Sequence, residues 1–147
     1  RAQMELAKRT GLPMIVHSRE AAADTLEEIR AAQDERLRGV IHCFSYSPEM
    51  ADEYLKMGYY IGVGGVVTFK NAKKLKEVVK MLPLDRILLE TDCPYLAPEP
   101  NRGRRNSSLN LPYVAAAIGE LKGADADEVI RVTNENAKKM YFGGRTI

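Results

Sequence analysis

Four short apolar runs recur at a nearly constant spacing along the 147 residues of this chain: 12–17, 39–43, 59–65 and 86–92. Counted from His17 to His42, Gly65 and Asp92, successive runs lie 25, 23 and 27 residues apart. Each run is rich in Val, Ile, Leu or Tyr and is almost continuously hydrophobic, which is typical of strands buried on both faces of a parallel sheet. The repeat therefore predicts four buried parallel strands.

Amphipathic segments separate these runs. Apolar residues repeat at helical spacing over residues 20–34, 48–58, 71–82, 113–122 and 125–141, and residues 1–9 have the pattern of the end of a helix. This order of one helix, four strand–helix units and a final helix predicts an α/β fold with right-handed crossovers. Two architectures fit: an open doubly wound sheet, or part of a (β/α)8 barrel, which needs about 250 residues.

Composition excludes several classes of protein. Hydrophobic residues make up 45% of the chain and charged residues 29%, as in ordinary globular domains. The net charge of +2 provides no general attraction for nucleic acid, and no apolar run approaches the roughly 20 residues of a membrane helix. Cys43 and Cys93 form no C-x-x-C motif, so we expect both to be small apolar side chains behind ligands in a reducing, cytoplasmic protein.

Three of the four runs end in a side chain that can bind a metal ion: His17, His42 and Asp92. The chain contains 2 histidines, and both occupy this position. Because the carboxyl ends of parallel strands meet at one rim, we expect these side chains to converge. Imidazole nitrogen and carboxylate oxygen together suit a divalent cation, so the pattern predicts a metal centre.

Glu90 lies two residues before Asp92, and strand alternation would place both side chains on the same face. A buried carboxylate needs a partner, so we expect Glu90 to contact a metal ligand or to act as an accessory base. A salt bridge at the end of the strand is the alternative interpretation of this pair.

Arginines gather after the last run, where Arg102, Arg104 and Arg105 surround a glycine. Guanidinium groups make bidentate hydrogen bonds with phosphate oxygens, and we expect Arg19, two residues beyond His17, to join them. A solvated surface loop is the alternative.

Gly62, Gly64 and Gly65 lack the spacing of a phosphate-binding loop. We expect them instead to allow close packing of the backbone at the rim of the sheet.

Several segments together carry a family resemblance: 17–19 (HSR), 42–45 (HCFS), 68–72 (TFKNA), 89–96 (LETDCPYL), 100–106 (PNRGRRN) and 133–137 (TNENA). They resemble the TatD-type metal-dependent deoxyribonucleases, and the resemblance covers essentially the whole chain. It implies a TIM barrel of the amidohydrolase type that holds one to three divalent metal ions, commonly Mg, Mn or Zn, and hydrolyses DNA phosphodiesters.

The resemblance also implies a role for each candidate residue. His17 and His42 resemble the metal ligands of the fifth and sixth barrel strands. Asp92 resembles the eighth-strand aspartate, which binds metal and helps to orient or deprotonate the attacking water. Glu90 resembles a neighbouring acid that serves an additional metal ion. The loop that handles the nucleic-acid backbone is represented by Arg102, Arg104 and Arg105.

Two family motifs have no counterpart in this sequence: the first-strand H-x-H or H-x-D, and the bridging Glu of the fourth strand. The resemblance therefore implies that residues 1–147 are a single partial domain. It would comprise the C-terminal four βα units and a final helix of a (β/α)8 barrel, with strands one to four missing. We expect such a chain to be weakly active or inactive alone, with DNA as the substrate of the complete enzyme and no membrane partner.

Two other functions remain open. The same ligands could serve a metal-dependent hydrolase of small esters, amides or lactones. The chain could also be a non-catalytic half-barrel that self-associates through the open edge strands of its sheet, at residues 12–17 and 86–92, because uncovered strand edges favour pairing with another chain.

Overall fold

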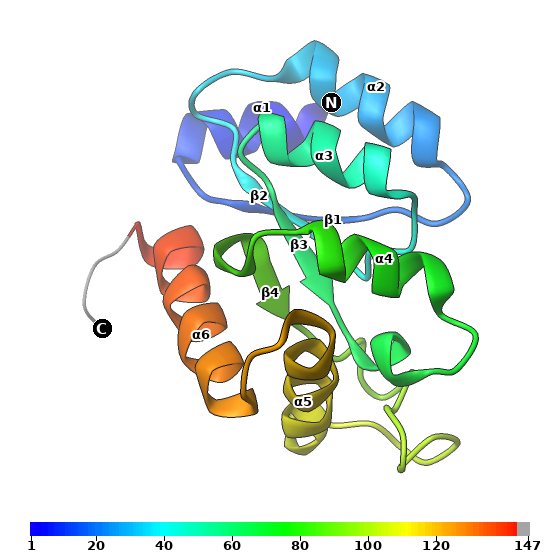
Figure 1. Cartoon of the computed structure of the whole chain (residues 1–147). Helices are drawn as coiled ribbons and strands as arrows, with labels where there is room; N and C mark the ends of the chain where they lie inside the picture. Colours follow the sequence, from blue (N-terminus) through cyan, green and yellow to red (C-terminus); the bar gives the residue numbers. More distant parts are fainter. Residues whose placement is uncertain (144–147) are drawn as a thin grey trace.

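The alternation of strands and helices is confirmed by the structure, a computed structural model that describes residues 1–143 (Figure 1). Four parallel strands pair in the order β1 (Met14–His17), β2 (Gly39–His42), β3 (Tyr60–Val63) and β4 (Ile87–Leu89). The helices are α1 (Ala2–Thr10), α2 (Ala22–Ala32), α3 (Pro48–Lys56), α4 (Lys73–Met81), α5 (Leu111–Lys122) and α6 (Ala126–Phe142). Short 3-10 turns occur at η1 (Gly65–Thr68), η2 (Leu84–Arg86) and η3 (Ser108–Asn110).

Helices α3 and α6 each begin at a residue whose side chain caps the first turn. The Ser47 hydroxyl accepts a hydrogen bond from the amide of Met50 at 3.4 Å at the start of α3, directly before Pro48. At the start of α6, the Asp125 carboxylate accepts one from the amide of Glu128 at 2.7 Å. Each cap satisfies a backbone donor that the first turn of a helix leaves unpaired, so these sequence patterns determine where α3 and α6 begin.

The main core lies on one face of the sheet. Ile41, Ile61 and Ile87 lie side by side across β2, β3 and β4 and are at most 1% exposed. All six helices contribute buried residues to this one core cluster: Met4, Ala7, Ile29, Ala51, Tyr54, Leu75, Val78, Val79, Val114, Ala115, Ile118 and Val129. A doubly wound sheet would divide its helices between both faces, and the single layer of helices does not fit that alternative.

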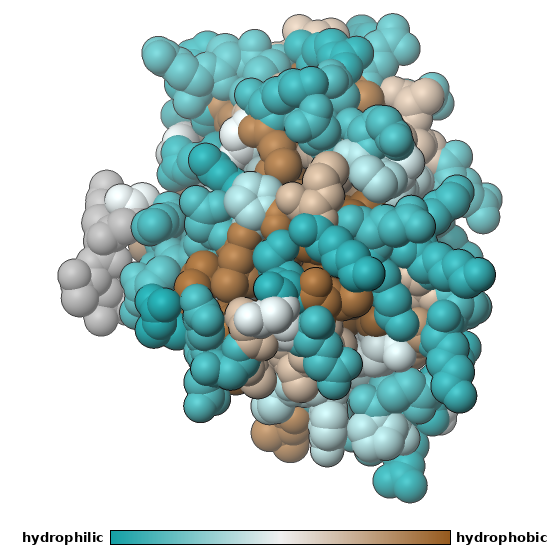
Figure 2. Space-filling model, in the orientation of Figure 1, coloured by the Kyte–Doolittle hydropathy of each residue, from teal (hydrophilic) through white to brown (hydrophobic). Residues whose placement is uncertain are grey.

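The opposite face of the sheet is covered only in part. Val40 of β2 and Leu88 of β4 pack there against Met140 from the C-terminal part of α6. Ile15 of β1 lies beside Val40 on the same face, and its side chain is 59% exposed. On the face drawn in Figure 2, hydrophobic side chains gather in a band across the middle, around β4 and between α6 and α4.

The last strand is shorter than its hydrophobic run. β4 ends at Leu89, although the amide of Glu90 still donates to the carbonyl of Val63 at 3.2 Å. Asp92 then adopts a left-handed backbone with φ of 51°, which no strand can contain. The strand predicted over residues 90–92 is therefore wrong, and a turn rather than strand alternation determines the position of Asp92.

Within the described residues, none of the helices combines the length and hydrophobicity needed to cross a bilayer.

The contact between α6 and the start of β4 allows a stability test. Asn136 is 1% exposed, and its side-chain amide donates to the carbonyls of Leu84 and Ile87, each at 2.9 Å. We expect Asn136→Ala to lower the free energy of unfolding by about 2 to 4 kcal/mol, because two carbonyls lose their donor. Urea unfolding measures this change. The control is Asn134→Ala on the exposed side of the same helix, expected within about 0.5 kcal/mol of the parent. Equal losses in the two variants would contradict the assignment.

Candidate metal centre

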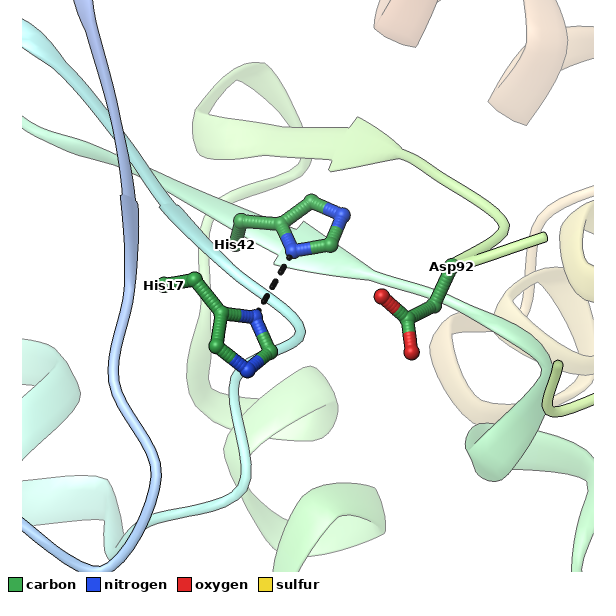
Figure 3. Close-up of side chains that lie close together, drawn as sticks. All are labelled: His17, His42 and Asp92. Carbon is green, nitrogen blue, oxygen red and sulfur yellow. Dashed lines mark hydrogen bonds between the residues drawn. The ribbon is translucent and has the colours of Figure 1, made fainter.

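The three strand-end side chains converge at the carboxyl end of the sheet (Figure 3). β1 and β2 pair in a register that sets His17 directly opposite His42, and their Nδ1 atoms lie 3.3 Å apart. One ligand atom from each of His17, His42 and Asp92 lies within 4.8 Å of the other two. In Figure 3 the Asp92 carboxylate extends toward the two imidazole rings. Two neutral nitrogens and one carboxylate oxygen at this spacing fit the ligand set of a divalent cation.

The carboxylate of Glu90 lies against His42. The Nε2 atom of His42 lies 3.0 Å from Oε2 of Glu90. This is a close contact without hydrogen-bond alignment, since Oε2 of Glu90 is buried and has no hydrogen-bond partner among the described residues. A carboxylate that holds the far nitrogen of a histidine is the usual support of a metal-binding imidazole, because it fixes the tautomer and the orientation of the ring. This contact favours the interpretation of Glu90 as a partner of a metal ligand.

Gly64, the residue after β3, leaves room for the Glu90 carboxylate. A Cβ atom at Gly64 would lie 2.4 Å from Oε1 of Glu90, and one at Gly65 would lie 2.2 Å from the carbonyl oxygen of Leu96. The expectation that these glycines allow close packing at the rim is confirmed. Burial is the main cause that raises the pKa of Glu90, followed on the same side by the charge of Asp92, while His42 opposes both.

Asp92 belongs to a turn that a buried asparagine holds in place. Asn106 is 3% exposed, and its side-chain amide donates to the carbonyls of Thr91 at 2.7 Å and Tyr95 at 2.8 Å. Its side-chain oxygen accepts a hydrogen bond from the side-chain amide of Asn110 at 2.8 Å. Both carbonyls that flank the left-handed backbone of Asp92 are therefore tied to the segment that begins α5.

His17 is supported from the other side of the site. The Tyr46 hydroxyl donates to the carbonyl of Ser18 at 2.8 Å and lies 2.8 Å from the Ser18 hydroxyl. The Ser18 hydroxyl also lies 2.8 Å from that of Thr25 in α2. The backbone that follows His17 is thus fastened to helix α2 and to the loop between β2 and α3, although His17 itself is exposed.

The candidate phosphate-binding arginines separate in space. Arg19 lines a pocket of about 460 Å³ together with His17 and Asp92. Arg102 instead lies over the ring of Phe69, with 4.2 Å between its guanidinium carbon and the ring centroid. The remaining two, Arg104 and Arg105, are exposed on the loop and do not line this pocket.

The two cysteines differ in their surroundings. Cys43 follows His42 and is half-buried, and burial together with the charges of Glu90 and Asp92 raises its pKa to about 11. Its thiol is therefore protonated at neutral pH. Cys93 is exposed, so the expectation of a packed apolar side chain is wrong there. Cys93 belongs to the turn that carries Asp92, and that turn directs its side chain to solvent.

Sequence reasoning missed three features of this site. Asn106 was part of a recognisable motif, but its two hydrogen bonds depend on a loop that folds back from residues 97–106. Tyr95 lines the pocket beside Asp92 with 71% of its surface exposed, and no periodicity indicates that position. The support of Ser18 by Tyr46 joins residues 28 positions apart, which no local pattern can indicate.

Comparisons with known proteins agree with this geometry. Residues 1–142 match the TatD related DNase family. The chain is 48% identical over 141 residues to "Uncharacterized metal-dependent hydrolase YabD" of Bacillus subtilis, covering 96% of this chain and 55% of YabD. It is 40% identical over 138 residues to the Escherichia coli metal-dependent hydrolase YcfH, covering 94% of this chain and 52% of YcfH.

Solved structures share the fold. The crystal structure of YjjV, a TatD homologue from Escherichia coli, superposes with a TM-score of 0.87 at 34% identity, covering 95% of this chain and 53% of YjjV. A TatD family hydrolase from Entamoeba histolytica gives a TM-score of 0.83 at 24% identity, covering 97% of this chain and 55% of that one. The chain thus spans about half the length of these relatives. The match over residues 1–142 and the shared fold show that it belongs to the TatD related DNase family.

Proposed function

We propose that this chain forms part of a metal-dependent hydrolase that cleaves phosphodiester bonds of DNA. The observation that carries the proposal is the convergence of His17, His42 and Asp92, whose ligand atoms lie within 4.8 Å of one another. Family membership supports hydrolysis that depends on a metal ion, such as Mg, Mn or Zn. Arg19, in the pocket beside the triad, supports a phosphate as the group that is attacked.

The residues of this site have different roles in the proposed hydrolysis. A divalent cation held by this triad supplies charge that polarises a phosphoryl oxygen and lowers the pKa of a bound water. Glu90 lies 3.0 Å from Nε2 of His42, where its carboxylate can favour the tautomer that binds metal. Asp92 extends into the same site, where its carboxylate oxygen can orient or accept a proton from the attacking water. The Arg19 guanidinium can hold a non-bridging phosphate oxygen by charge-assisted hydrogen bonds.

We also propose that the four βα units and final helix are the C-terminal half of a (β/α)8 barrel, a single partial domain. Three observations support this: helices layered on one face of the sheet, the incompletely covered second face, and relatives about twice as long. The ligands contributed by strands one to four of such a barrel are absent from this sequence. On this proposal, residues 1–147 hold half of the ligand set.

Metal binding is the first test. We expect the chain to bind Zn²⁺ and Glu90→Gln to weaken its affinity by about 10- to 100-fold, because the support of His42 is reduced. His17→Ala and Asp92→Ala should weaken the affinity for Zn²⁺ by at least the same factor. Isothermal titration calorimetry measures these affinities, with the exposed Asp127→Asn as the control. Unchanged Zn²⁺ affinity after loss of His17 or Asp92 would reject the centre.

Hydrolysis by the isolated chain is the second test. With Mg²⁺ and a fluorescent oligodeoxynucleotide, we expect only weak cleavage by the isolated chain, because on this proposal half of the ligands are missing. Arg19→Ala should lower the remaining rate by about 10- to 100-fold, as expected when a hydrogen bond to a charged group is lost. Arg131→Ala on the exposed surface of α6 is the matched control.

Two results would contradict these expectations. Efficient multiple-turnover cleavage by the isolated chain would show that the triad needs no further ligands. If Arg19→Ala left DNA cleavage unchanged while the chain hydrolysed p-nitrophenyl acetate efficiently, a hydrolase of small esters or amides would be favoured instead.

We also propose that the chain can self-associate through the edges of its sheet. Within residues 1–143 the edges are β1 and β4, and each borders an apolar groove, lined at β1 by Leu6, Leu12 and Ile15 and at β4 by Leu89, Leu111 and Ile130. We expect concentration-dependent association in sedimentation equilibrium, weakened by Ile15→Lys, because a charge on an edge strand opposes pairing. Met81→Lys, at a residue 43% exposed at the end of α4, is the control. A monomer at every concentration would exclude pairing through these edges.

A further inference from the structure

The pocket beside the metal triad is lined by two chemically different kinds of residue. It encloses about 460 Å³. Its lining includes charged and metal-binding residues, namely His17, Arg19 and Asp92, and apolar or aromatic residues, namely Val66, Tyr95 and Leu96. The charged and metal-binding residues can hold an anion and its cation. They leave the apolar residues of the lining without a role. A ligand that fills this pocket therefore combines an anion with an apolar moiety.

Tyr95 is the largest exposed group among those apolar or aromatic residues, with 71% of its surface accessible. Its backbone is nevertheless held at both ends, because its amide donates to the carbonyl of Asp92 at 3.0 Å and its carbonyl accepts from Asn106 at 2.8 Å. The turn that positions Asp92 thus also positions Tyr95. An aromatic ring on a fixed backbone, left in solvent beside a candidate catalytic centre, is arranged as a contact surface.

We propose that the Tyr95 ring is the platform on which a nucleobase stacks when the attached phosphate lies at the His17–His42–Asp92 centre. This inference rests on the proposed phosphodiester hydrolysis and names the part of the substrate that the apolar or aromatic residues of the pocket recognise. Stacking requires only a planar π face, so the contact accepts every base and adds affinity without reading sequence. Tyr95 is then a specificity residue for nucleotides over simple phosphate esters.

The test compares two ligands that differ only in the base: thymidine 5′-monophosphate and 2-deoxyribose 5-phosphate. Their affinities for the 147-residue chain are measured by NMR titration in Mg²⁺. We expect the nucleotide to bind about 5- to 150-fold more tightly, the range of one base–aromatic stack. Tyr95→Phe should keep this preference because it keeps the ring. Tyr95→Ala should remove it while leaving the affinity for the sugar phosphate unchanged.

Tyr113→Ala is the matched control, because this tyrosine of α5 is 43% exposed and lines a different cavity. It should retain the full preference for the nucleotide. Equal affinity of the parent chain for both ligands, or a preference that survives Tyr95→Ala, would overturn the inference. Neither ligand contains a phosphodiester, so a failure to cleave DNA would count against the proposed reaction and leave this comparison of affinities intact.

Discussion

The register of β1 against β2 is the constraint on which the candidate site depends. It pairs Met14 with Gly39 and therefore sets His17 beside His42 at the end of both strands. A slip of one residue would turn one imidazole to the opposite face, because side chains alternate along a strand. Gly39 supports the observed register, since a Cβ atom there would lie 2.1 Å from the carbonyl oxygen of Met14. A residue remote from the metal ligands thus helps to bring their nitrogens together.

The other half of the site depends on loops instead of the sheet. Asp92 follows a strand that has already ended, and its left-handed backbone is compatible with a short polar side chain. Buried amide hydrogen bonds from Asn106 replace the missing ladder and fix the turn on both sides of the carboxylate. The histidines are therefore positioned by sheet geometry and the aspartate by a side-chain network, so their sensitivities to mutation should have different origins.

Much of this arrangement could be predicted from the sequence, because strand ends in a parallel sheet must converge. Hydrophobic periodicity located all four strands, and the residue types at their ends located the triad. The prediction failed where tertiary contacts override local pattern. Residues 86–92 have the length of a strand, but beyond Leu89 the amide of Glu90 makes the last hydrogen bond to β3, and the turn held by Asn106 takes Thr91 and Asp92 out of the sheet. Likewise, the sequence predicts that Arg102 binds phosphate, but the loop places its guanidinium over the ring of Phe69.

The uncovered part of the sheet connects stability with chemistry. Ile15 and His17 lie on the same face of the edge strand β1, and the C-terminal part of α6 reaches Val40 and Leu88 but leaves Ile15 59% exposed. Whatever covers Ile15 removes apolar surface from water, which is favourable in itself. It also lowers the local dielectric around the imidazole of His17, and electrostatic interactions with a cation or phosphate strengthen when water is excluded. Covering Ile15 would therefore both stabilise the sheet and strengthen electrostatic interactions at the candidate metal centre.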